Sequence, residues 1–200
     1  MKSNVCKIEN GSKDLEAIFK ESEIVAKNNG LTHKQTLQLR LICEEIDGML
    51  PNVVDNFEGK LWFEFDSGVC KVNVSVELEE LTSSKKNELI SFAKNNKNAA
   101  ATGVVGKIRS MIENFFLCQD TMEEIALSSG SFHLSTGYSE GVDFPYFWSL
   151  NQYRSSIPTE QKNDWDELEK SVIASVADDI IVGVKGKRVD IVIIKKFCGW

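Results

Sequence analysis

The chain has 200 residues, of which 23 are lysine or arginine and 30 are aspartate or glutamate, for a formal net charge of −7. With 42% hydrophobic and 26% charged residues, the composition is that of a globular domain rather than a disordered chain. The acidic balance disfavours binding to nucleic acid or anionic lipid, and no apolar run approaches the roughly 18 residues of a membrane span.

Five cysteines are scattered along the chain without a CxxC pair. The N-terminal segment, residues 1–14, contains the first of them, Cys6, and lacks the apolar run of a signal peptide. Scattered cysteines in such a chain are typical of reduced thiols. We therefore expect a cytoplasmic protein. The two histidines, His33 and His133, have no metal-ligand spacing to a cysteine, which disfavours a zinc site.

Hydrophobic periodicity predicts helices and hairpins in alternation. Helical spacing predicts five helices, in chain order 14–28, 32–50, 83–97, 104–115 and a charged helix over 159–176. Alternation predicts two hairpins, with strands 60–66 and 71–78 around Asp66-Ser67-Gly68, and strands 180–184 and 189–194 around Lys185-Gly186-Lys187. We expect Thr32 to cap the second helix and Pro51 to end it. This order predicts an α+β two-layer sandwich, with helices on one face of a mixed, largely antiparallel sheet.

The chain is predicted to form one domain over 1–200, with an N-terminal helical unit over 1–30 and an aromatic-rich insertion or lid over 128–158. The aromatic residues invite a base-stacking interpretation. That interpretation requires a surrounding basic groove, whereas 132–153 contains two acidic residues and no lysine or arginine. An aromatic core or a lid over a pocket is the better prediction.

Glu45 is the acidic residue whose position most needs a reason. On the second helix it shares a stripe with Leu41 and Met49, one turn before and after it, so apolar neighbours flank its carboxylate. Burying a carboxylate is costly unless it is paired or its pKa rises. A glutamate that reaches out to solvent or to a lysine is the alternative. Arg40 and Glu44, four residues apart, are predicted to form an ion pair on a solvated side of the helix.

A glycine-containing segment opens the predicted fourth helix. The free N–H groups at a helix start form an anion site, and Gly103 or Gly106 would let a phosphate approach the backbone. Lys107 follows directly, and Lys97, near the start of the same loop, is placed to close over a phosphate. Asn98 either joins such a site or simply turns the chain. The alternative is that the two glycines allow close packing of the helix on the sheet; the segment is not a P-loop.

Residues Leu37–Leu50, LQLRLICEEIDGML, resemble the first motif helix of the histidine-kinase-like ATPases (the GHKL superfamily, or Bergerat fold). The likeness is greatest to the stand-alone anti-sigma-factor serine kinases, and the predicted element order over 32–197 resembles their plan. Residues 97–109, KNAAATGVVGKIR, are similar to a segment of uncharacterised ATPase-like proteins of anaerobic Firmicutes. The resemblance implies a bacterial protein that binds ATP and Mg²⁺, with Glu45 as the base that orients the attacking water or hydroxyl.

Two positions depart from the family pattern. The asparagine that binds Mg²⁺ four residues after the glutamate is replaced by Met49, a soft and weak ligand for a hard cation. Counting from Glu44 instead puts Gly48 there. The adenine-binding motif, an aspartate followed by two spaced glycines, is expected after Leu78, but residues 77–84, ELEELTSS, contain no glycine.

These departures shift the functional expectation from catalysis to binding. The chain is predicted to be a regulatory protein with a degenerate nucleotide pocket that contacts a protein partner or a small ligand. The alternative is an active ATPase or serine protein kinase that resembles the anti-sigma factors.

Overall fold

The computed structural model describes residues 1–9, 15–53, 57–78, 104–109, 111–112, 146–156 and 171–197. The strands are β1 (Cys6–Glu9), β2 (Phe57–Asp66), β3 (Val69–Leu78), β4 (Tyr146–Ser149), β5 (Asp179–Lys185) and β6 (Arg188–Lys196). The helices are α1 (Leu15–Asn28), α2 (His33–Val53), α5 (Leu150–Ser156) and α7 (Val172–Val176), with further helical residues at 104–109 and 111–112.

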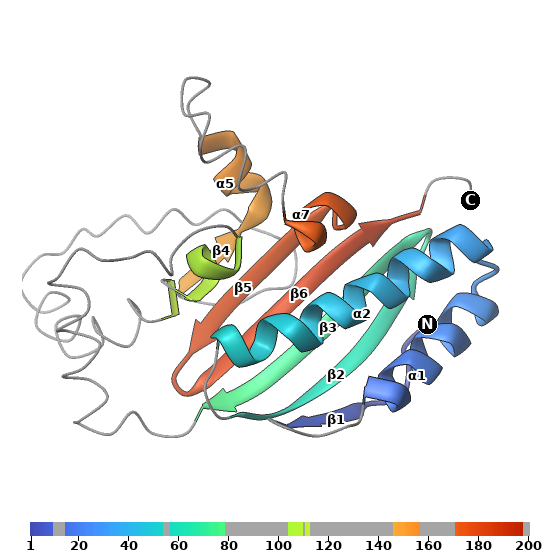
Figure 1. Ribbon diagram of the computed structural model, residues 1–200, viewed down its shortest axis with the longest axis horizontal. Helices are drawn as coiled ribbons and strands as arrows, with labels where there is room; N and C mark the ends of the chain where they lie inside the picture. The colour runs from blue at the N-terminus through green and yellow to red at the C-terminus, as the bar shows by residue number, and fades with distance from the viewer. Residues whose placement is uncertain are drawn as a thin grey trace, which may run out of the picture.

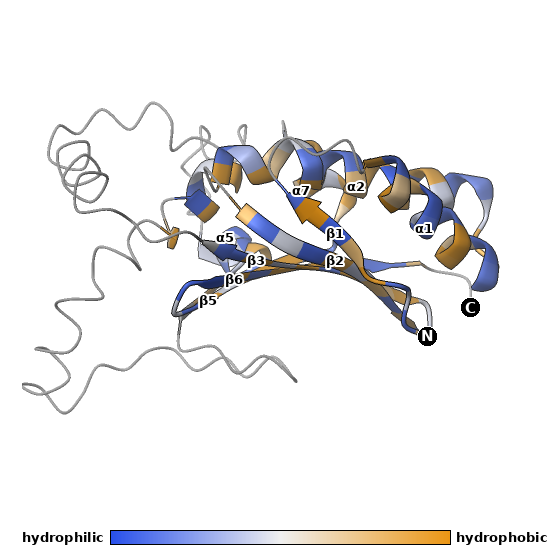
Figure 2. Ribbon diagram, turned by 90° about the horizontal axis from the view of Figure 1, so that it is seen from below, coloured by the Kyte–Doolittle hydropathy of each residue, from blue (hydrophilic) through white to orange (hydrophobic). Residues whose placement is uncertain are grey.

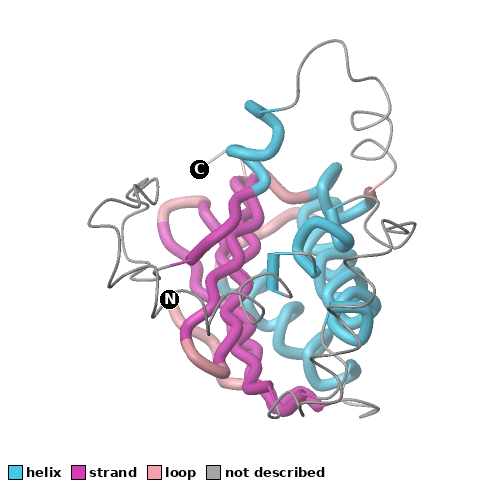
Figure 3. Tube along the Cα trace, turned by 90° about the vertical axis from the view of Figure 1, so that its left-hand side faces the viewer, coloured by secondary structure: helices cyan, strands magenta, loops and turns pink. Residues whose placement is uncertain are grey.

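The strands form one six-stranded sheet in the order β1-β2-β3-β6-β5-β4 (Figure 1). All the pairings between these described strands are antiparallel. Helices α1, α2 and α7 lie together over one face of the sheet (Figures 2 and 3). The predicted α+β two-layer sandwich is therefore confirmed.

Both predicted hairpins are present, and their strands are slightly longer than predicted. In the β2–β3 turn, Ser67 and Gly68 both have positive φ, 48° and 78°. A two-residue turn of this kind matches the right-handed twist of the flanking strands. Gly186, in the β5–β6 turn, has a φ of 60°. Glycine adopts this conformation without strain.

The hydrophobic core lies between the sheet and the helices. The alternate residues of β2, β3, β5 and β6 that face the helices are buried, as is one face of α2. Leu39, Ile42 and Ile46 of α2 are among the largest side chains with almost no exposure, together with Leu61 and Phe63 of β2. This long amphipathic helix therefore anchors the helical layer to the centre of the sheet.

The structure differs from prediction at the end of the second helix. Pro51 was expected to end it, but α2 continues to Val53 with Pro51 inside its last turn. The side chain of Val53 is buried in the core, and the guanidinium of Arg109 donates a hydrogen bond of 3.2 Å to the backbone oxygen of Asn52. These tertiary contacts hold the last turn helical, although Pro51 removes one helical N–H donor.

Other predictions are tested only in part. The predicted helix 83–97 lies outside the described residues, as do 113–115 of the fourth helix and 159–170 of the charged helix. Of the aromatic-rich segment, the structure describes β4 and α5. Neither of these two elements was predicted. None of the described helices has the length and apolarity to cross a bilayer.

Two buried thiols give a test of this core. Burial raises the pKa of Cys43 above its ordinary range and that of Cys70 to about 12. Because the thiolate is the reactive form, iodoacetamide at mildly alkaline pH should leave both unmodified in the folded protein and modify both in urea. Peptide mass spectrometry measures this, with the half-buried Cys6 as the more accessible comparison. Rapid modification of Cys43 without denaturant would contradict the packing.

Candidate functional site

Helix α2 carries the predicted catalytic residue, and its start is well defined. The hydroxyl of Thr32 accepts a hydrogen bond of 3.4 Å from the backbone N–H of Gln35, whose side-chain oxygen accepts one of 2.8 Å from the backbone N–H of Thr32. This reciprocal pair is a capping box. The predicted cap at Thr32 is confirmed. With the start of α2 defined, the position of each later residue around the helix axis follows from the helical repeat of about 3.6 residues per turn.

One flank of α2 faces α1. Arg40 lies 3.7 Å from Glu23 of α1 and stacks over the Phe19 ring at 4.3 Å. It also forms the predicted ion pair with Glu44, at 3.4 Å. Since α2 lies between α1 and α7 (Figure 1), its other flank faces α7.

Glu45 belongs to this second flank. It is rotated about 140° from Arg40 around the helix axis, away from α1. Its side chain is half-buried, and its carboxylate has no hydrogen bond or ion pair in the structure as described. Glu45 thus differs from its neighbour Glu44, which is exposed and held by Arg40.

The helical residues 104–109 and 111–112 pack beside the end of α2. Val104 and Ile108 are buried in the same core as the apolar face of α2, so this segment lies on the helical side of the sheet. The hydrogen bond from Arg109 to Asn52 then ties it to the last turn of α2. The structure therefore brings together the two elements on which the sequence analysis placed a site. The contact of Arg109 was not predicted, because nothing in its spacing identified the backbone oxygen as its partner.

Of the predicted phosphate-binding residues, two are described. Gly106 is buried within the helical segment, and the ammonium of Lys107 lies 5.3 Å from the ring centroid of Tyr153 on α5. A cation over a ring face is held by the ring quadrupole. Lys97, Asn98 and Gly103 lie outside the described residues, so the phosphate site stays a prediction.

Met49 occupies the position of the expected metal-binding asparagine. It is only 3% exposed and belongs to the hydrophobic core of the domain. Its thioether is thus packed among apolar side chains, where no hard cation would be stabilised. The alternative position, Gly48, is exposed and has no side chain to offer. Among the residues the structure describes, no group of three histidine, cysteine or acidic side chains is arranged to hold a metal ion.

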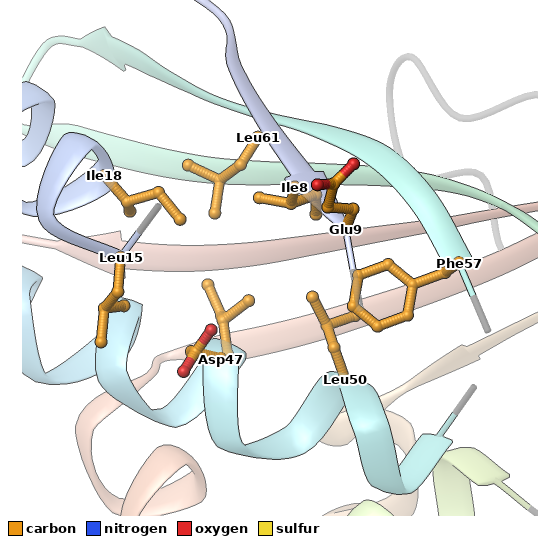
Figure 4. Close-up of a pocket in the computed structure, with 9 residues that line it drawn as sticks. Ile8, Glu9, Leu15, Ile18, Asp47, Leu50, Phe57 and Leu61 are labelled. Atoms are coloured by element: carbon orange, nitrogen blue, oxygen red, sulfur yellow. The ribbon is translucent and has the colours of Figure 1, made fainter. Parts of the chain in front are cut away.

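A small cavity lies on the α1 side of α2 (Figure 4). Apolar side chains from β1, α1, α2 and β2 line it, together with Glu9 and Asp47. Its volume is about 20 Å³, and one water requires roughly 10–15 Å³. The cavity can hold a single water but no nucleotide. It also lies on the flank of α2 opposite to Glu45, so it is not part of the candidate site.

Comparisons of the chain with protein-family models, with curated proteins and with solved structures give no match.

Proposed function

We propose that this protein is a regulatory module with the fold of the histidine-kinase-like ATPases, whose degenerate nucleotide pocket binds a protein partner or a small ligand without turnover. The order of elements supports the fold assignment: a long helix carrying Glu45, a hairpin, a helical segment that returns to that helix, and a closing antiparallel hairpin. A cytoplasmic location is part of the same proposal.

The observation that carries the proposal is the burial of Met49. In the related ATPases the corresponding asparagine provides an oxygen for Mg²⁺, and the metal neutralises the phosphates. A core methionine cannot turn outward to a metal without leaving a cavity behind. The residues present at this position therefore do not fit a Mg²⁺ ion.

The surroundings of Glu45 support a binding role for the same flank of α2. A half-buried carboxylate without a partner is a group that a ligand or partner can satisfy with a hydrogen-bond donor. Two cations, Lys107 and Arg109, lie on the helical segment that contacts the last turn of α2 through the hydrogen bond from Arg109 to the Asn52 backbone oxygen. This mixture of an acceptor and two cations suits a polar ligand or a charged segment of a partner protein.

Thermal melting with adenine nucleotide tests the proposal. A ligand at 100 times its dissociation constant stabilises a protein by about 2.7 kcal/mol, which is several degrees for a domain of this size. We expect the melting temperature with ATP to be the same with Mg²⁺ as with a chelator, and no release of phosphate. A rise of several degrees that requires Mg²⁺, together with phosphate release, would refute the proposal.

That outcome would favour the second candidate function, an active ATPase or serine protein kinase. The unpartnered carboxylate of Glu45 is the observation in its favour, since a general base must be free to accept a proton. In that case Glu45→Gln should abolish phosphate release and leave nucleotide binding intact. Glu44→Gln is the matched control, because Glu44 lies next in the chain but on the solvated side with Arg40.

A further inference from the structure

The outer edge of β1 has no pairing partner among the strands that the structure describes. The backbone N–H of Ser3 donates a hydrogen bond of 2.9 Å to the backbone oxygen of Phe63 on β2. Because successive residues of a strand direct their backbone N–H and C=O groups to alternate sides, the odd-numbered residues of β2 direct theirs toward β1. In the β1–β2 register these residues oppose the even-numbered residues of β1. The backbone groups of Lys7 and Glu9 therefore point away from β2, and no described strand pairs with them there.

A β-bulge limits this open edge. Asn4 and Val5 together oppose the single residue Trp62. The backbone N–H of Asn4 turns toward α1 and donates a hydrogen bond of 2.9 Å to the buried carboxylate of Glu21. Regular strand geometry begins again at Cys6. Any additional strand is thus restricted to the short stretch that contains Lys7 and Glu9.

The charges on this part of the sheet are unfavourably matched within one chain. Lys7 is directly opposite Lys60, and Glu9 is directly opposite Glu58. All four side chains are exposed and lie on the face away from the helices, because Ile8, which alternates with Lys7 and Glu9, is buried in the core. Like charges in directly opposed positions are destabilising. Lys7 does pair with Glu9 along its own strand, at 3.3 Å.

Helix α1 leaves the edge accessible. A groove of about 520 Å³ runs between β1 and α1. Val5 on the strand side and Ile24 on the helix side are 54% and 38% exposed. Figure 1 shows β1 as the outermost strand beside α1. There is room for a second strand to lie along β1.

We propose that two copies of this chain associate through β1, antiparallel about a two-fold axis at Ile8. In this register Lys7 of one copy is directly opposite Glu9 of the other, and both residues direct their backbone groups toward the new strand. Four side chains then lie in a row across the interface: Lys60 and Lys7 of one copy, followed by Glu9 and Glu58 of the other. The two-fold axis generates a second row, in which Glu58 and Glu9 of the first copy are followed by Lys7 and Lys60 of the second. Each like-charged pair thereby gains an opposite-charged neighbour, and the two sheets become continuous.

This second copy is favoured over an unrelated strand because the charge pattern is self-complementary, as a two-fold interface requires. The inference does not depend on the nucleotide proposal. Because the paired stretch is short, the association is expected to be weak and to depend on protein concentration.

Sedimentation velocity over a range of concentrations tests the association. The unmodified protein should self-associate, and Lys7→Glu or Glu9→Lys should each weaken self-association by about tenfold, because each places like charges opposite one another at two symmetric positions. An equimolar mixture of the two variants should associate again, since the opposed pairs are then of opposite charge. The double variant Lys7→Glu/Glu9→Lys should also recover association.

Lys185→Glu is the matched control, because it makes the same charge change at an exposed position on β5 and should leave association unchanged. Two results would overturn the proposal. One is an unmodified protein that stays monomeric at every concentration. The other is self-association that the Lys7 and Glu9 variants do not alter, which would place the interface elsewhere. Circular dichroism establishes that the single variants are folded, and the mixing experiment uses those same two preparations.

Discussion

Replacing Met49 with asparagine should lower the free energy of unfolding by about 3 kcal/mol. The family resemblance would suggest that asparagine restores a metal site, but the side chain at this position is 3% exposed and packed in the core. The substitution removes core contacts and places an amide where it has no hydrogen-bond partner. Urea denaturation followed by circular dichroism measures the change.

Met49→Leu is the control for this prediction. It keeps the volume and apolar character of the site, so its effect should be below about 1.5 kcal/mol. The opposite outcome is also informative. If Met49→Asn retained full stability and gained Mg²⁺-dependent nucleotide binding, the side chain would have to face a pocket, and the regulatory proposal would lose its main support.

Replacing Gly59 with alanine should lower the free energy of unfolding by about 2–3 kcal/mol. A Cβ atom at Gly59 would lie 2.5 Å from the backbone oxygen of Ser75 and 2.7 Å from a methyl carbon of Val76. Both atoms belong to β3, and the oxygen cannot move without disturbing the sheet. Thermal or urea denaturation tests this expectation.

Gly48→Ala provides the contrast, because it is the same substitution in open space. A Cβ atom there meets nothing within 4 Å, and Gly48 is an exposed residue within α2. Alanine favours a helix over glycine by about 0.5–1 kcal/mol. Gly48→Ala should therefore stabilise the protein. Equal effects of the two substitutions would show that β2 and β3 are not as closely spaced as described.

The elements predicted well are those whose signal is local. The β2–β3 and β5–β6 hairpins combine strict alternation with turn residues that accept positive φ, and the structure contains both. Helix α1 was predicted over 14–28 and spans Leu15–Asn28, followed by Gly30 with a φ of 63°. In these places a few neighbouring residues determine the conformation.

The two edge strands were missed because their signal is not local. In β1 only Ile8 is fully buried, with Cys6 partly buried on the same face, so the alternation with Lys7 and Glu9 covers just four residues and is too short to identify a strand. Strand β4 has four residues and is defined by its pairing with β5. The end of α2 was misjudged for a related reason, since Arg109 and the core around Val53 hold it beyond Pro51.

For the candidate site, the sequence predicted the helix α2 and the partial burial of Glu45, but not that the side chain at the expected metal-binding position is buried. The apolar neighbours of Glu45 indicated a partly buried carboxylate, and its side chain is half-buried. The burial of Met49 could not be inferred from the helical pattern, because Glu45 and Met49 share a stripe. The tertiary packing places Met49 in the core and leaves Glu45 at its boundary.

The central seam of the sheet, where β3 pairs with β6, has a kinetic consequence. The paired residues are about a hundred or more positions apart along the chain, whereas each hairpin closes locally. Both hairpins can therefore form early, and their docking requires the closure of a very large loop. Once that seam has formed, changing the length of the intervening chain costs little, about 0.6 kcal/mol for a doubling. This topology lets the length of the chain between the hairpins change at little cost to the stability of the sheet.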